Sequence, residues 1–519
     1  MGSLLKSTGI VAASTLTSRI MGFLRDMLFA KYFGATGATD AFWIAFRIPN
    51  MMRRFVAEGT LTISFIPVYS DILINEGEKE ALALAQKTLS ILFVALIGII
   101  SIGMIFSPEL AGLLAWGIDD PGILSLAGKL TRYMFPYLFF VSFVAFSMGV
   151  LNTHGYFFAP AFSPVLLNIN IIVGIVLLGR FFQEPLYGVA VGVIAGGLFQ
   201  LILQIPYLIK SGFKLRISLD LKHPGIRRIG RLIAPTLFGA GIYEINIIII
   251  TILSSMLPSG NITYLYYCNR LTELVIGIFI VSIGSVVLPE MSKLKSIDDM
   301  EQFKKVFRGS MNASMFLAIP ASTALVIIGF PILSVLFMRG KFTPADAEVT
   351  YRALVYASIG ISSVSILRIV TPAFYSLKDA KTPVIAAFIN FILNFFLGYF
   401  LMGTSLKLAG LTLGLSISVT VQIIILLVIL QRKIGHIQFG QIFISMLKYI
   451  AASIVMGIVI MQLSGLADWV KGSILERILI LLLTIFSGGM TYFAVCYLLK
   501  VDEIKYLLGK VKGKLKLSS

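Results

Sequence analysis

The stretch LSILFVALIGIISIGMIF, residues 89–106, contains eighteen residues and no charged side chain. A helix needs about 20 apolar residues to cross the ~30 Å hydrocarbon core of a bilayer. Because hydrocarbon offers no hydrogen-bond partners, a segment that crosses it has to satisfy its own backbone groups as an α-helix. Residues 89–106 therefore predict a transmembrane helix.

The same pattern recurs along the chain. Comparable apolar runs occupy 134–151, 165–179, 186–209, 232–257, 274–289, 313–337, 353–375, 384–402, 408–430, 444–464 and 474–499. Two further segments, 8–32 and 38–75, are helix-like but polar, and Pro49 and Pro67 should kink or break the second. Only 13% of residues are charged, against about a quarter in soluble proteins. We therefore expect an all-α polytopic membrane protein with about fourteen transmembrane helices.

Basic residues predict how the chain is oriented and divided. The net charge of +18 comes mainly from Lys and Arg in alternate loops, which the positive-inside rule places in the cytoplasm together with both termini. The strongest cluster consists of Lys210, Lys214, Arg216, Lys222, Arg227, Arg228 and Arg231. We expect this cluster to link two six-helix lobes, 1–215 and 216–433, with two helices and a basic tail forming 434–519. A short repeat, Ser163-Pro164-Val165 and Thr382-Pro383-Val384, supports two related halves.

Ionisable side chains within the spans are the candidate functional residues. Each costs at least ~2.5–3.5 kcal/mol at the bilayer centre, so such groups usually face protein or a watery cavity. The basic ones are Arg19, Arg25, Arg47, Arg53, Arg54, Arg270, Arg368 and Lys448. Guanidinium groups bind phosphate through a planar fork and keep their charge when partly dehydrated. The arginine excess therefore predicts a cavity for a membrane-embedded anion, either a phospholipid or a polyprenyl-pyrophosphate sugar.

Acidic side chains in the same spans could neutralise part of this charge. Asp26 follows Arg25 directly, and Glu273 lies three residues after Arg270. Asp40 either pairs with an arginine or caps the second helix. The predicted gating or charge partners are Asp26, Asp40, Glu58 and Glu273.

Several of these residues lie in motifs that resemble one known family. The motifs are TSRIMGFLRD (17–26), ATDAF (38–42), PNMMRRFVAEG (49–59), YYCNRL (266–271), LPEMS (288–292) and GKFT (340–343). Over nearly the whole chain, and in register, they resemble the MurJ (MviN) family of lipid II flippases, in the multidrug/oligosaccharidyl-lipid/polysaccharide exporter superfamily.

The resemblance implies two six-helix lobes around a central cationic cavity, with two extra helices forming a groove for a lipid tail. It also implies that the substrate is undecaprenyl-pyrophosphoryl-MurNAc-pentapeptide-GlcNAc, which is used in peptidoglycan synthesis. Our hypothesis is that alternating access moves this lipid from the inner to the outer leaflet. The family's functional arginines match Arg19, Arg25, Arg53 and Arg270. Its functional acid matches Asp40, and Glu58 matches a motif position.

A sodium site is a weaker expectation from the same resemblance. Some relatives have an acid in the seventh helix that contributes to such a site, but Ile250 occupies that position here. Asn390 and Asn394 remain as weak candidate ligands, because sodium needs oxygen atoms around it.

Other functions stay open at this point. A flippase for another polyprenyl-linked glycan has the same physical requirements, whereas a cation-coupled drug exporter needs buried acids without an arginine cluster. An enzyme needs catalytic acids at the membrane, but Asp119-Asp120 and Asp298-Asp299 lie in predicted turns. No Gly-rich phosphate loop occurs, so we expect no cofactor. We expect a monomer in a bacterial inner membrane that contacts lipid II, membrane lipids and cell-wall synthesis machinery, but no nucleic acid.

Overall fold

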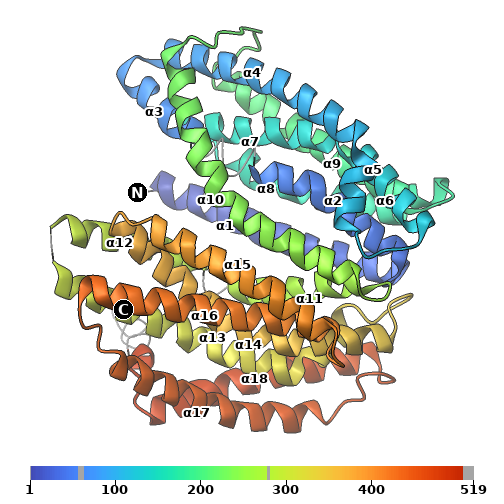
Figure 1. Cartoon of the computed structure of the whole chain (residues 1–519), viewed down its shortest axis with the longest axis vertical. Coiled ribbons are helices and arrows are strands. Elements are labelled where there is room, and N and C mark those ends of the chain that lie inside the picture. Colours follow the sequence, from blue (N-terminus) through green and yellow to red (C-terminus); the bar gives the residue numbers. More distant parts are fainter. Residues whose placement is uncertain (1, 56–63, 278–280, 298, 506–519) are drawn as a thin grey trace. The chain divides into compact units, whose positions relative to one another are not determined.

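A computed structural model describes residues 2–55, 64–277, 281–297 and 299–505, and within these it gives the backbone alone for 2–7, 234–243 and 281–286. The described residues form eighteen α-helices and one 3-10 helix, with no β-strand among them (Figure 1). The chain divides into two compact units, Met1–Thr263 and Tyr264–Ser519. Most of the predicted basic tail, 506–519, lies outside the described residues.

The first unit packs its helices around α8 and α9. Its elements are α1 Gly2–Phe33, α2 Gly37–Arg53, α3 Ile66–Asn75, α4 Glu78–Ile105, α5 Ser107–Leu114, α6 Pro121–Met134, α7 Tyr137–Thr153, α8 Phe158–Val176, η2 Leu178–Phe181, α9 Leu186–Lys210 and α10 Pro224–Ser255. Helix α8 lies between α1 and α9, and α7 covers another side of α9. Helix α2 packs against α6.

The second unit is organised around α13, α14 and α16. Helix α11, Asn261–Val275, begins just before it. The others are α12 Val281–Ser296, α13 Met300–Leu336, α14 Pro344–Ser376, α15 Lys381–Met402, α16 Leu408–Ile434, α17 Phe439–Ser464 and α18 Ile474–Leu498. Helices α17 and α18 pack against each other, and α17 lies along α13. The two last predicted spans therefore attach to this unit through α13. The predicted lobe limits at 215/216 and 433/434 remain predictions.

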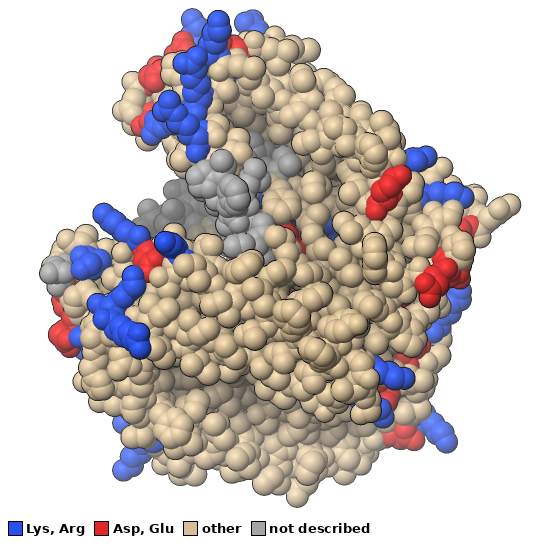
Figure 2. Space-filling model, viewed as in Figure 1, with Lys and Arg blue, Asp and Glu red and all other residues tan. Residues whose placement is uncertain are grey.

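Ten of the fourteen predicted spans are recovered as helices that are long and apolar enough to cross a membrane within the described residues. The other four coincide with α1, with α2 and α3, with α10, and with α11 and α12. Figure 2 shows that a wide uncharged surface covers each unit and that most Lys, Arg, Asp and Glu side chains lie toward its margins. The chain is therefore a multi-pass membrane protein.

Helix ends follow the local sequence. Pro49 lies inside α2, which continues to Arg53, and Pro67 lies in the first turn of α3. Residues 56–63 lie outside the described residues, so the predicted kink or break of segment 38–75 remains a prediction. Asp120 caps α6 and Asp299 caps α13, as expected for turns, while Asp298 lies outside the described residues.

Helices α8 and α9 meet along a seam of glycines. A Cβ atom at Gly192 would lie 2.5 Å from the carbonyl oxygen of Asn170, and one at Gly174 would lie 2.7 Å from the carbonyl oxygen of Gly188. Small residues let transmembrane backbones approach closely enough for van der Waals packing to hold them together. This seam fixes α8, which carries one of the polar side chains of the candidate site.

Candidate functional site

Arg25 lies at the centre of a polar cluster between α1 and α8. Its Nε and Nη2 atoms donate to one carboxylate oxygen of Asp26, at 2.9 and 2.6 Å, and Nη1 donates to Oδ1 of Asn168 at 3.1 Å. Asn168 in turn donates from Nδ2 to the Ser18 carbonyl oxygen at 3.1 Å. Asp26 is fully buried, and a buried carboxylate is tolerated only when it is paired and hydrogen-bonded. The predicted pairing of Arg25 with Asp26 is thus present, with Asn168 as an additional partner.

Arg47 and Arg54 connect α2 with α10. Arg54 Nη1 lies 3.0 Å from a carboxylate oxygen of Glu244, whose side chain is only 5% exposed. Arg47 donates to the hydroxyl of Thr251 and, at 3.4 Å, to the carbonyl oxygen of Ile247. Arg47 and Arg54 therefore each have a structural partner on α10.

Arg53 is half-buried near the end of α2, and its Nε donates to Oδ1 of Asn50 at 2.9 Å. Arg19 is half-buried on α1, seven residues before Asp26 and hence on the same helix face. Glu58, one of the predicted gating or charge partners, lies outside the described residues.

Asp40 holds the beginning of α11. Its carboxylate accepts hydrogen bonds from the backbone N–H groups of Gly260, at 2.6 Å, and Thr263, at 2.8 Å, and from the Thr263 hydroxyl at 2.6 Å. The first N–H groups of a helix have no intrahelical acceptor, and the helix dipole favours an anion there. Asp40 therefore supplies a tertiary cap to α11. The cap of its own helix is Thr36, which forms a capping box with Thr39, so Asp40 is not the cap of α2.

Arg270 and Glu273 belong to α11 in the second unit, where Arg270 is half-buried and Glu273 is exposed. Arg19, Arg25 and Arg53 belong to the first unit. The convergence of all four arginines on one ligand therefore remains a prediction.

The candidate sodium ligands are buried on one face of α15. Asn390 is 4% exposed and Asn394 is 1% exposed, and their spacing of four residues places them on neighbouring turns. The described part of the chain holds no group of three or more His, Cys, Asp or Glu residues that could bind a metal ion. A sodium site remains a prediction.

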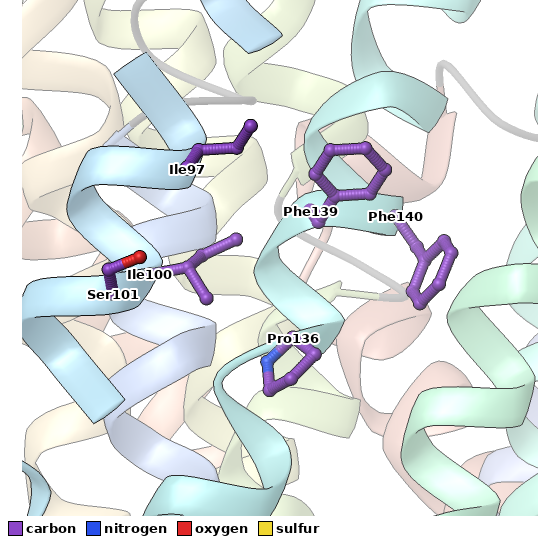
Figure 3. A pocket seen from close by; sticks show the side chains of 6 residues that line it. All are labelled: Ile97, Ile100, Ser101, Pro136, Phe139 and Phe140. Atoms are coloured by element: carbon purple, nitrogen blue, oxygen red, sulfur yellow. The ribbon is translucent and has the colours of Figure 1, made fainter. Parts of the chain in front are cut away.

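A hollow in the first unit is too apolar to bind an anion. It lies between α4 and α7 and has a volume of about 260 Å³ (Figure 3). Its lining consists of Ile97, Ile100, Ser101, Pro136, Phe139 and Phe140. These side chains suit a hydrocarbon chain, so the hollow is not a candidate phosphate site.

Asn168 and Thr263 were not among the residues predicted from the sequence to form the site. Both act through helices that are distant in sequence, 143 residues from Arg25 and 223 residues from Asp40.

Comparisons with known proteins give a consistent result. The chain matches the sequence profile described as "Lipid II flippase MurJ" over residues 29–480. A "Probable lipid II flippase MurJ" from Vibrio cholerae is 36% identical over 510 residues, which is 96% of each chain. A "Lipid II flippase MurJ" from Burkholderia cenocepacia is 34% identical over 379 residues, covering 72% of this chain and 73% of its own.

Solved structures agree with the sequence relatives. "Lipid II flippase MurJ, inward closed conformation" superposes with a TM-score of 0.79 at 26% identity, covering 95% of this chain and 99% of that one. An inward-facing multidrug resistance MATE family transporter superposes with a TM-score of 0.70 at 13% identity, covering 81% and 95%. The second similarity concerns the fold alone.

Proposed function

Because this chain belongs to the MurJ family of lipid II flippases, we propose that it moves lipid II from the inner to the outer leaflet and serves peptidoglycan synthesis. The full-length match to the Vibrio cholerae relative carries this proposal. Such a protein is a transporter and not an enzyme. The expected family and fold class are confirmed, and the 13% identity to a MATE transporter gives no reason to prefer drug export.

The test is depletion of the protein in its host, followed by measurement of the lipid-linked sugars in each leaflet. Lipid II should accumulate in the inner leaflet, and its headgroup should no longer become accessible from outside. Accumulation of a different polyprenyl-linked glycan, with lipid II distributed normally, would overturn the substrate assignment.

Arg19, Arg25, Arg53 and Arg270 are the proposed ligands of the pyrophosphate. Arg25 supports this role because Asp26 and Asn168 already hold its guanidinium in one orientation. A preorganised donor loses less conformational entropy when it binds an anion. Pyrophosphate carries more negative charge than one carboxylate and can compete for the same guanidinium.

The acids Asp40, Glu58, Asp26 and Glu273 are proposed to exchange with the phosphates as charge partners during alternating access. A cycle of this kind requires the ligand to bind the two conformations with different affinity. The lipid tail would lie along α17 and α18, the predicted 434–519 part, where Ile454, Ile458, Leu482 and Phe486 are exposed.

Native mass spectrometry of Arg25→Gln measures the ligand role directly. Lipid II retention should fall at least about tenfold, which corresponds to roughly 1.4 kcal/mol of lost binding free energy. Lys129→Gln is the control, because Lys129 is exposed on α6. Equal retention by Arg25→Gln and the control would remove Arg25 from the site.

The location of the chain is proposed to be a bacterial inner membrane with both termini in the cytoplasm, where it works as a monomer near the cell-wall synthesis machinery. The support is the basic loop between α9 and α10. In intact cells, an impermeant maleimide should label Lys471→Cys but not Lys222→Cys, and the reverse pattern would invert the topology.

A further inference from the structure

Residues 213–222, which we name the strap, connect α9 and α10 without regular secondary structure. Every second residue is a large aliphatic side chain directed into solvent. The exposed fractions are 76% for Leu215, 85% for Ile217, 61% for Leu219 and 68% for Leu221. Four adjacent exposed aliphatic side chains form an apolar patch of the kind that marks an interaction surface.

The strap is fixed to α4 by polar contacts that leave these side chains outside. The contacts are Gln86 Nε2 to the Lys214 carbonyl oxygen (2.8 Å), Ser90 Oγ to the Arg216 carbonyl oxygen (3.4 Å), Ser218 N to Ser90 Oγ (2.9 Å) and Lys87 Nζ to Asp220 Oδ2 (3.0 Å). At its beginning, Phe213 is buried against Phe146 of α7. The outward direction of the aliphatic side chains is therefore set by α4.

The contact points on α4 lie at the start of its apolar surface. Three to seven residues after Ser90, the helix exposes Phe93 (41%), Val94 (53%) and Ile97 (48%) in a segment that can span a membrane. The strap therefore lies where α4 enters the bilayer, and its aliphatic side chains extend the apolar surface of α4.

The charge carried by the strap and its flanking residues is almost entirely positive. Residues 210–231 contain the seven basic residues of the cluster described above and a single acid, Asp220. That acid is neutralised by Lys87, which holds the pKa of Asp220 below its ordinary value. Figure 2 shows Lys and Arg side chains gathered, together with several Asp and Glu side chains, at the end of the first unit where α3, α4 and α10 meet. Such a cluster attracts anionic headgroups.

We propose that the strap binds anionic phospholipid at the membrane interface: its four aliphatic side chains insert among the acyl chains, and Lys214, Arg216 and Lys222 bind headgroup phosphates. A partner protein that adds a β-strand is disfavoured, because backbone groups at Lys214, Arg216 and Ser218 already bond to α4. The proposal goes beyond lipid II transport, and its tests do not depend on transport.

The first test measures the depth of the aliphatic side chains. The variant Ile217→Cys, in which Cys268 and Cys496 are replaced by Ala, is labelled with a nitroxide at residue 217. The labelled protein is then reconstituted in nanodiscs that contain phosphatidylglycerol. The nitroxide at residue 217 should collide more often with oxygen, which concentrates in the membrane, than with a water-soluble nickel complex. A nitroxide on Lys129→Cys should collide more often with the nickel complex. A label at 217 that is as accessible to nickel as the one at 129 would overturn the proposal, as would protection that appears only when another protein is added.

The second test keeps both native cysteines. Native mass spectrometry compares retained phosphatidylglycerol for Lys214→Gln/Lys222→Gln with a matched pair of exposed lysines, Lys129→Gln/Lys471→Gln. Loss of one basic group near a membrane surface lowers affinity about fivefold, so the strap variant should retain at least about fivefold less lipid. Equal retention by both double variants would contradict the proposal.

Discussion

Asp40→Asn tests whether the acid in the second segment supports the fold. The wild-type carboxylate accepts hydrogen bonds from two backbone N–H groups and one hydroxyl at the start of α11, and it is only 3% exposed. Asparagine has nearly the same shape but only one side-chain acceptor oxygen. Its NH₂ group would therefore face the N–H of Gly260 or of Thr263.

The expected loss can be worked from these contacts. A buried donor left without an acceptor costs about 1–3 kcal/mol, and hydrogen bonds to a neutral acceptor are weaker than bonds to a carboxylate by about 1 kcal/mol. Asp40→Asn should therefore destabilise the protein by about 2–4 kcal/mol. Thr263→Val removes the hydroxyl but keeps both backbone bonds, so it should cost only about 1 kcal/mol.

Thermal unfolding of the detergent-solubilised protein, followed by fluorescence-detected size exclusion, measures both losses. Asp120→Asn is the matched control, because Asp120 also accepts from helix N–H groups but is exposed, so water can replace it. The order of melting temperatures should be wild type, then Asp120→Asn and Thr263→Val, then Asp40→Asn. A melting temperature of Asp40→Asn equal to that of wild type would refute the capping role.

Three other perturbations probe the two units. Glu244→Gln should lower the free energy of unfolding by about 1–3 kcal/mol, because it breaks an ion pair with Arg54 that is only partly exposed to water. The double variant Arg54→Glu/Glu244→Arg should restore part of this loss. No recovery in thermal stability would mean that the pair does not stabilise the protein. Gly192→Val should cost about 1–3 kcal/mol by forcing α8 and α9 apart, and undiminished thermal stability would contradict the close seam. Burial raises the pKa of Asp379, but the Lys433 ammonium and two hydrogen bonds from Thr382 outweigh this and hold the pKa at about 2, below the ordinary 3.8. The free energy of unfolding should be higher for wild type than for Lys433→Gln, and this difference should be fully present above pH 3.8 and disappear as the pH falls through about 2. A difference that persists at lower pH would refute the dependence on the charge of Asp379.

The sequence predicted the apolar helices well because length and composition alone decide them. Ten of the fourteen predicted spans were recovered in this way. Segment 8–32 escapes a composition test because Arg19, Arg25 and Asp26 interrupt it, yet α1 is helical throughout this range. The prolines of segment 38–75 predict a kink or break, because proline removes a backbone donor and obstructs the preceding turn. Helix α2 continues past Pro49 to Arg53, and the residues that follow, 56–63, lie outside the described residues.

The contacts of the candidate site were harder to predict from the sequence, because the residues that form them are far apart along the chain. Adjacency alone suggested the pair Arg25 and Asp26, whereas the bond from Arg25 to Asn168 depends on how α1 packs on α8. Asp40 was expected to pair with an arginine or cap its own helix. It caps α11 instead, an arrangement that no local pattern encodes.

The central claim is that guanidinium groups within the transmembrane segments bind the pyrophosphate of lipid II. It is tested most directly by following headgroup translocation in cells that make only one variant. Arg25→Gln and Arg270→Gln should each abolish exposure of the lipid II headgroup on the outer surface, while Lys129→Gln should leave it at the wild-type level. Wild-type exposure in both arginine variants, at equal amounts of folded protein in the membrane, would contradict the account.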